Sequence, residues 1–262
     1  MKNLGACIIL FFCIMASCGF IAIKGERFQQ AAGGGGPSAL YTAAVAVWDF
    51  ENDATDTKGT YDLTANNAPT YGTTTPPQGS YYAELSAASS QSFTYADNPA
   101  FDLSATDFGI AYWIKRTSAT SNQHAVGKYD GGAGNGWRIS GGYHSGSDYS
   151  DFLRLYSGFS NSEADPGDNG DFITTNWQCI TWSFDNDTNT MTVWISESTF
   201  GDIANGTTFS GMTVDAAENT SPLYVGGYDA THLLTGSLDE MAIWHQELTA
   251  TDAQNFFNGT WR

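Results

Sequence analysis

The stretch WQCITWSFD, residues 177–185, decides the fold class of this chain. Its apolar side chains Ile180, Trp182 and Phe184 stand at alternate positions, a pattern typical of a β-strand that buries one face in a hydrophobic core. Residues 107–116, DFGIAYWIKR, repeat the pattern. Both stretches therefore predict strands with one buried face.

Short apolar or alternating runs of this kind recur along the chain and are separated by clusters of Gly, Asn, Asp, Ser and Thr, as in antiparallel β proteins. No long helical pattern competes with them. Residues 184–189, FDNDTN, lie between two runs and predict a hairpin loop, because Asn and Asp tolerate left-handed conformations. The predicted strands are residues 44–50, 80–86, 92–95, 107–116, 124–128, 136–141, 152–156, 177–184, 191–195, 223–228 and 234–244.

One short helix is predicted, near the C-terminus. Thr249 with Asp252 three residues later resembles a capping box, which marks the start of a helix. Phe256 and Phe257 supply apolar anchors, and the Asn-Gly pair at 258–259 is a stop signal.

The composition excludes one class of function. The chain has 262 residues, with 10 Lys plus Arg against 28 Asp plus Glu and a formal net charge of -18. A nucleic-acid binder that works through basic patches is therefore excluded, because phosphate contacts need clustered Lys and Arg. The same acidity makes anionic glycans poor candidate ligands unless calcium bridges them.

The first residues predict export. Residues 4–23 carry no charge and are preceded by Lys2 and followed by Lys24. They fit a cleaved secretory signal, an uncleaved membrane anchor, or a bacterial lipoprotein signal in which Cys18 of the stretch MASCG would carry the lipid. We expect a protein that is secreted or held at the cell surface, with membrane contact only through this segment.

The domain organisation follows from the composition. Residues 1–23 are the export segment, residues 24–40 form a Gly-rich linker with four consecutive glycines, and residues 41–262 form one domain. Cys179 is the only cysteine of that domain, so no internal disulfide is expected there. A lone cysteine in a strand pattern is most often a small buried hydrophobe.

Five segments, taken in order, resemble the laminin-G-like, concanavalin A-like jelly-roll domains. Together they cover nearly all of residues 41–259, although Gln178 and Cys179 stand where the family often has two histidines. The resemblance implies an all-β fold, an antiparallel β-sandwich of the concanavalin A-like jelly-roll type with one short C-terminal helix. The segments are residues 45–51 with the turn at 56–59, residues 93–95 with 107–115, residues 177–185 with 191–195, residues 236–244, and residues 248–250.

The sequence argues against catalysis. This fold hosts lectins, carbohydrate-binding modules, protein-binding modules and some glycosidases. Glucanases of the class use a Glu-x-Asp-x-Glu strand, which puts carboxylates on one face of the sheet. That motif does not occur here, and the adjacent pair Asp239 and Glu240 is expected to point to opposite faces. We therefore expect a protein that is not an enzyme.

The resemblance also implies a calcium ion at the rim of the sandwich, because the family often carries one. By motif position the expected ligands are Asp56, in the turn after the first strand, and Asp239, in the last strand, with Glu51 as a weaker third. Regular alternation would put Asp239 on the same face as Met241 and Ile243, at the edge of the core, where it needs a partner. The alternative is that Asp239 caps backbone N–H groups.

Aromatic residues near loops are the candidates for binding sugar, since Trp and Tyr rings stack on sugar rings. The alternative for each ring is that it covers the core. The favoured function is an exported, non-catalytic module that recognises a glycan, a polysaccharide or another surface polymer. The alternative is a structural or adhesive surface protein, cellular or viral, that binds proteins, and a glycoside hydrolase is the least favoured. The candidate residues are Tyr129, Trp137, Tyr143, Tyr149 and Tyr228, with Asp130 and His144 as polar partners.

Overall fold

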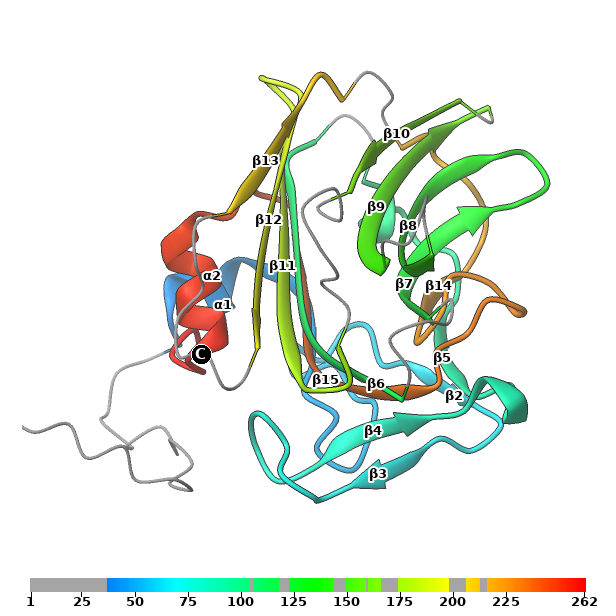
Figure 1. The fold of residues 1–262 in the computed structure, drawn as a ribbon, viewed down its shortest axis with the longest axis vertical. Helices are drawn as coiled ribbons and strands as arrows, with labels where there is room; N and C mark the ends of the chain where they lie inside the picture. The colour runs from blue at the N-terminus through cyan, green and yellow to red at the C-terminus, as the bar shows by residue number, and fades with distance from the viewer. Residues whose placement is uncertain are drawn as a thin grey trace, which may run out of the picture.

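Two antiparallel sheets lie face to face, here named sheet A and sheet B (Figure 1). The computed structural model describes residues 37–103, 106–117, 123–143, 149–158, 160–165, 174–197, 206–212 and 216–262. In spatial order, sheet A contains β13 (Thr207–Ser210), β12 (Thr190–Glu197), β11 (Gln178–Asp185), β6 (Phe108–Arg116), β15 (Gly236–Trp244), β4 (Tyr82–Leu85) and β3 (Thr70–Gly72), and β1 (Ala44–Trp48) also pairs with β15. Sheet B contains β10 (Ser160–Ala164), β9 (Tyr149–Ser157), β8 (Asn135–Tyr143), β7 (Gln123–Asp130), β14 (Leu223–Val225), β5 (Ser92–Tyr95) and β2 (Thr64–Asn66). The predicted all-β sandwich is confirmed.

The core between the sheets follows from the alternation that the sequence predicted. β11 pairs with β6 so that Trp182 lies opposite Ile110 and Ile180 lies opposite Tyr112. All four side chains are fully buried and belong to one hydrophobic cluster. The loop after β11 is the predicted hairpin, and Asn189 in it has a positive φ of 52°.

A second hydrophobic cluster covers the other face of sheet A. The rings of Trp244 in β15, Phe256 in α2 and Trp261 pack together, with Trp244 and Trp261 centroids 5.7 Å apart. Figure 1 shows both helices on the side of sheet A that faces away from sheet B. These two α-helices are α1 (Ala39–Ala43) and α2 (Ala250–Phe257). The described residues also form two 3-10 turns, η1 (Ala87–Ser89) and η2 (Pro99–Phe101).

The predicted helix near the C-terminus is confirmed as α2. Thr249 accepts a hydrogen bond from the Asp252 backbone N–H, and the Asp252 carboxylate accepts one from the Thr249 backbone N–H, which completes a capping box. Cys179 is fully buried in the second cluster, as expected for a small hydrophobe, and burial raises the pKa of its thiol.

Several elements were not predicted. β2, β3, β10 and β13 are short and largely polar, and α1 is a single turn that Ser38 caps. None of them carries an apolar period that a sequence could reveal. The export segment, with Cys18, lies outside the described residues. Within the described part of the chain, no helix is long and apolar enough to cross a membrane.

A buried lysine ties sheet B to the loops around it. The side chain of Lys128 in β7 is 0% exposed, and its Nζ lies 2.7 Å from Asp102 Oδ1 and 2.9 Å from Asp97 Oδ1. It also donates to the backbone carbonyl of Asn219, whose own side-chain amide donates to the carbonyls of Lys128 and Asn135. This network holds β7, β8 and the segments that precede β6 and β14 together.

Replacement of Lys128 by Met should lower the free energy of unfolding by about 3 kcal/mol, because removing one partner of a buried ion pair leaves the other charge uncompensated. Urea denaturation measures the change. Lys115→Met removes the same charge from a half-buried position in β6 and should cost less than about 0.5 kcal/mol. Equal losses in the two variants would contradict the role given to Lys128.

Candidate functional site

The outer face of sheet B, which faces away from sheet A, carries one continuous row of cross-strand neighbours. Trp137 and Ile139 of β8 point into the core, so Arg138 between them points outward. The register then continues the row to both sides of Arg138. From β10 to β14 its members are Glu163, Arg154, Arg138, Gly127 and Tyr224.

Around this row lies a group that we name the tyrosine–arginine cluster: Tyr129, Arg138, Tyr156, Tyr228 and His232. The guanidinium carbon of Arg138 lies 4.3 Å from the ring centroid of Tyr228, 4.9 Å from that of Tyr129 and 5.2 Å from that of Tyr156. His232 stacks on Tyr228 with centroids 4.7 Å apart and ring planes 13° apart. The cluster joins β7, β8, β9 and the loop after β14.

Gly127 allows the cluster to close. A Cβ atom at this position would lie 2.6 Å from the Cβ of Tyr228 and 2.9 Å from the Cβ of Arg138. Real Cβ atoms do not approach so closely, so only glycine lets these two side chains meet over β7.

The loop after β14 holds the other side of the cluster. The carboxylate of Asp229 accepts hydrogen bonds from the backbone N–H groups of Thr231 and His232 and forms an ion pair with the His232 ring at 2.8 Å. Burial opposes ionisation of Asp229, but these donors outweigh it and lower its pKa. The loop therefore presents His232 on the surface in one orientation.

Burial and the neighbouring cations decide the ionisation of this face. Burial, then His232 and Arg138, lower the pKa of His124 to about 3, so its ring is neutral at physiological pH. Burial raises the pKa of Tyr228 to about 12 although Arg138 acts in the opposite direction. Arg138 thus carries its positive charge beside the phenols of Tyr129 and Tyr228, whose pKa values burial raises.

The structure brings together two of the predicted sugar-binding residues. Tyr129 and Tyr228 meet edge to face with centroids 5.9 Å apart. Asp130 is half-buried and caps a turn, where it accepts hydrogen bonds from the N–H groups of Gly132 and Ala133. His144 and the side chains of Tyr143 and Tyr149 lie outside the described part of the chain.

The expectation for Trp137 is corrected. Its side chain is 1% exposed and belongs to the core between the sheets, where Nε1 donates to the Phe101 carbonyl at 2.8 Å. It cannot stack on a sugar. Arg138 was not predicted as a site residue, although strand alternation from Trp137 and Ile139 places it on the outer face of sheet B.

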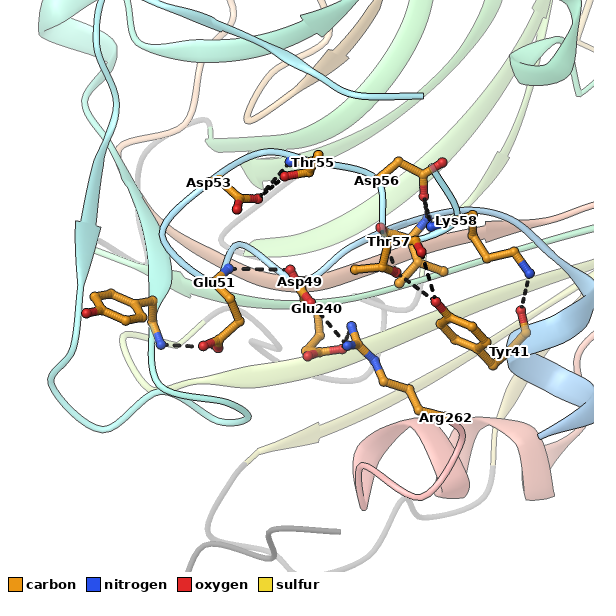
Figure 2. Close-up of polar contacts among 12 residues, drawn as sticks. Tyr41, Asp49, Glu51, Asp53, Thr55, Asp56, Thr57, Lys58, Glu240 and Arg262 are labelled. Carbon is orange, nitrogen blue, oxygen red and sulfur yellow. Dashed lines mark hydrogen bonds and ion pairs between the residues drawn. The ribbon is translucent and has the colours of Figure 1, made fainter. Parts of the chain in front are cut away.

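The predicted metal ligands come from the loop after β1 and from β15, and Figure 2 shows two of them, Glu51 and Asp56. Asp56 is buried and accepts four backbone hydrogen bonds, two on each oxygen. Its role is thus to hold the turn after β1, and the expectation that it binds calcium is corrected, since no oxygen is left free.

Asp239 departs from the predicted alternation. Glu240 has a positive φ of 48°, and the pairing of β15 with β6 shifts between Asp239 and Ala242. This β-bulge inserts one residue, so Asp239 lies opposite Trp113, on the outer side of sheet A, while Met241 and Ile243 point into the core between the sheets. The prediction that Asp239 shares their face is therefore wrong. The prediction that Asp239 and Glu240 point to opposite faces is also wrong, because it assumed regular alternation.

Asp239 and its neighbours form a group that we name the acidic rim: Asp49, Glu51, Asp239, Glu240 and Arg262. Asp239 and Glu240 are buried, and the other three are half-buried. The Arg262 guanidinium lies 2.7 Å from Glu240 and 3.2 Å from Asp49, as Figure 2 shows for both carboxylates. Glu51 accepts hydrogen bonds from the loop before β4 through Oε1, whereas Asp239 Oδ1 is buried without a hydrogen-bond partner among the described residues.

Burial raises the pKa values of both rim carboxyls that lie in the bulge. The pKa of Asp239 lies well above its usual value because of burial and then because of Glu240. Burial raises the pKa of Glu240 to about 7, although Arg262 lowers it. The unpartnered Oδ1 of Asp239 fits one ligand of a cation. However, no group of three or more His, Cys, Asp or Glu residues in the described ranges is arranged to hold a metal ion.

Comparison with known proteins agrees with this architecture. Residues 88–254 match the family model described as the concanavalin A-like lectin/glucanases superfamily. No curated protein matches the sequence.

Three solved structures illustrate the likeness of fold. The binding domain of Paraclostridial Mosquitocidal Protein 1 is 19% identical with a TM-score of 0.62, and the match covers 84% of this chain and 53% of that one. Domain 4 of AbnA, a GH43 extracellular arabinanase from Geobacillus stearothermophilus, solved with arabinotriose, is 17% identical with a TM-score of 0.58, and the match covers 81% of this chain and 97% of that one. The binding domain of botulinum neurotoxin DC in complex with SialylT is 14% identical with a TM-score of 0.59, covering 85% and 52%. The chain spans about half the length of the two toxin domains.

The buried rim predicts a pH effect on stability. Because the pKa of Glu240 is raised from 4.5 to about 7, the folded chain keeps a proton that the unfolded chain loses in this window. The free energy of unfolding should therefore fall as pH rises from about 4.5 to about 7, by up to about 3 kcal/mol from this group, and stay at the lower level above it.

Glu240→Gln should reduce this slope, because the amide keeps an oxygen acceptor for Arg262 and does not titrate. Glu218→Gln, at an exposed position, serves as the control and should leave the slope unchanged. Denaturant unfolding at a series of pH values measures both. The same slope in wild type and Glu240→Gln would show that burial of this carboxyl does not govern it.

Proposed function

Because this chain belongs to the concanavalin A-like lectin/glucanase superfamily, we propose that it is a non-catalytic recognition module that binds carbohydrate on the outer face of sheet B. The observation that carries the proposal is the tyrosine–arginine cluster. Aromatic rings and a guanidinium on one open sheet face are the groups that stack on sugar rings and donate hydrogen bonds to their hydroxyls.

Exposure within the cluster indicates which residues would contact the sugar. Tyr156 and Tyr228 are buried beneath their neighbours, whereas Tyr129 and Arg138 are half-buried and His232 is exposed. The two buried rings would hold Arg138 in position, and the more exposed side chains would form the contact surface.

The carboxylates support binding without hydrolysis. A glycosidase needs a pair of accessible carboxyls on either side of the scissile bond. Asp239 and Glu240 are buried, and on the outer face of sheet B Glu163 pairs with Arg154 while Asp229 pairs with His232. Two of these acids are therefore buried away from a sugar ring, and the other two already form ion pairs.

The setting of the module is proposed from the sequence. The uncharged segment at residues 4–23 supports secretion or attachment to the cell surface. Among the similar structures, domain 4 of the arabinanase was solved with arabinotriose, and the botulinum neurotoxin DC binding domain with SialylT and also with rat synaptotagmin II. Binding of a protein ligand is accordingly the second candidate.

A calcium ion at the acidic rim is part of the proposal. Asp239 and Glu51 are the residues that would hold it, and Asp56 would not. Calcium takes about six to eight oxygen ligands, so backbone carbonyls and water would have to complete the set. When bound, the ion would supply the positive charge that the buried carboxylate of Asp239 lacks.

Replacement of Tyr129 by Ala should weaken glycan binding about five- to tenfold, since an aromatic contact contributes roughly 1 kcal/mol. The glycan is first found on an array and then titrated by calorimetry. Tyr81→Ala, in the loop before β4, is the matched control. The proposal fails if no glycan binds, or if a bound glycan is insensitive to Tyr129→Ala. A protein partner that excess sugar does not displace would favour the second candidate.

Calcium should raise the midpoint of thermal unfolding, because an ion that binds only the folded chain stabilises it, by about 2.7 kcal/mol at 100 times its Kd. Asp239→Asn should remove the rise, and a chelator should reverse it in the wild type. Asp53→Asn is the control and should keep the rise. Asp53 is exposed and lies in the loop after β1 that also holds Glu51. A midpoint that calcium does not move would exclude the rim site.

A further inference from the structure

The outer face of sheet B also indicates the class of sugar. Resting on the proposed function, we propose that Arg138 binds the carboxylate or sulfate of an acidic sugar, with the tyrosine–arginine cluster packed around the same sugar ring. Uronic or sialic acids and sulfated sugars share this oxyanion chemistry.

Arg138 differs from the other arginines in the described residues. Arg154 pairs with Glu163, Arg262 with Asp49 and Glu240, and Arg116 donates to Gln178. A guanidinium carries five N–H donors. In the described part of the chain no residue accepts a hydrogen bond from Arg138, and its Nε is buried without a partner.

The three tyrosine rings explain how the cation is tolerated but do not satisfy its donors. Ring faces attract a cation, by roughly 0.5–2 kcal/mol, yet they are poor substitutes for an oxygen acceptor in the plane of the guanidinium. A carboxylate or sulfate offers two oxygens that match the guanidinium fork. An oxyanion would therefore complete a site that the rings have already arranged.

The register adds a second reason. Arg138 lies directly opposite Arg154 across β8 and β9, and like charges at such positions are destabilising. Glu163 on β10 forms an ion pair with Arg154. Arg154 lies between Glu163 and Arg138 in the row, so Glu163 pairs with the nearer of the two arginines. Within the described ranges, no carboxylate is paired with Arg138, and a ligand anion would relieve the repulsion.

The carboxylates nearby do not compete for Arg138. Asp229 is engaged by Thr231 and His232, and the His124 ring close to it is neutral. The acidity of the whole chain opposes an anionic ligand at long range, but salt screens that field beyond about 8–10 Å. Contacts within the cluster therefore decide the outcome.

The test compares neutral, carboxylated and sulfated oligosaccharides of matched length. They are first bound on an array, and the best of each class is titrated into the whole chain by calorimetry. We expect an acidic glycan to bind best and Arg138→Gln to weaken it about tenfold or more while changing a neutral glycan less than about threefold. Arg138→Lys, which keeps the charge but loses the fork, should fall in between.

Two controls make the result specific. Lys115→Gln removes one positive charge from sheet A and should leave binding unchanged. The thermal midpoint of each Arg138 variant shows whether it folds, and Arg138→Lys carries the test if the glutamine variant does not. Preference for the carboxylated or the sulfated set identifies the source of the oxyanion.

The outcomes separate this inference from the proposed function. If the chain binds neutral glycans as well as acidic ones, or if Arg138→Gln weakens both classes equally, the acidic ligand is excluded and the carbohydrate-binding module remains. If no glycan of any class binds, both proposals fail. Binding confined to acidic glycans and lost in Arg138→Gln supports both.

Discussion

The central strands of sheet A are buried on both faces, and the rest of the architecture depends on this constraint. One face of β6, β11 and β15 packs against sheet B, and the other packs against α1, α2 and Trp261. Sheet A therefore has no open face along these strands. In the described residues no helix covers the outer face of sheet B, so a ligand that recognises a sheet surface meets sheet B there.

The acidic rim and the outer face of sheet B use charge in opposite ways. At the acidic rim, β15 contains one inserted residue, and Asp239 and Glu240 at this bulge are both buried. Burial raises the pKa values of both carboxyls. On sheet B, the guanidinium of Arg138 is kept among three tyrosine rings. Among the described residues, Asp239 Oδ1 at the rim and Arg138 Nε on sheet B are buried without a hydrogen-bond partner. An external ion or ligand gains most where a buried polar group lacks its partners.

Much of the fold could be predicted from the sequence because its central strands alternate. Trp182 and Phe184 mark a buried face, and Thr249 with Asp252 marks the start of α2. β10 and β13 could not be predicted, since their polar residues owe their conformation to a neighbouring strand. The site was predicted less well. Tyr129 and Tyr228 are in the cluster, but Trp137 is in the core, and Arg138 became informative only when the register showed its neighbours. The bulge at Glu240 moved Asp239 to the opposite face of sheet A from the one predicted, and no residue type in the sequence indicates such an insertion.

The engagement of Asn219 has a consequence for producing this protein. Asn219-Thr220-Ser221 satisfies the acceptor pattern for N-linked glycosylation. Its amide nitrogen already donates to the carbonyls of Lys128 and Asn135, and a glycan on that nitrogen would compete with both bonds. In a eukaryotic secretory host, glycosylation at this pattern would alter the segment that holds β7 and β8 together. A host without this modification leaves the native contacts of Asn219 available to the folding chain.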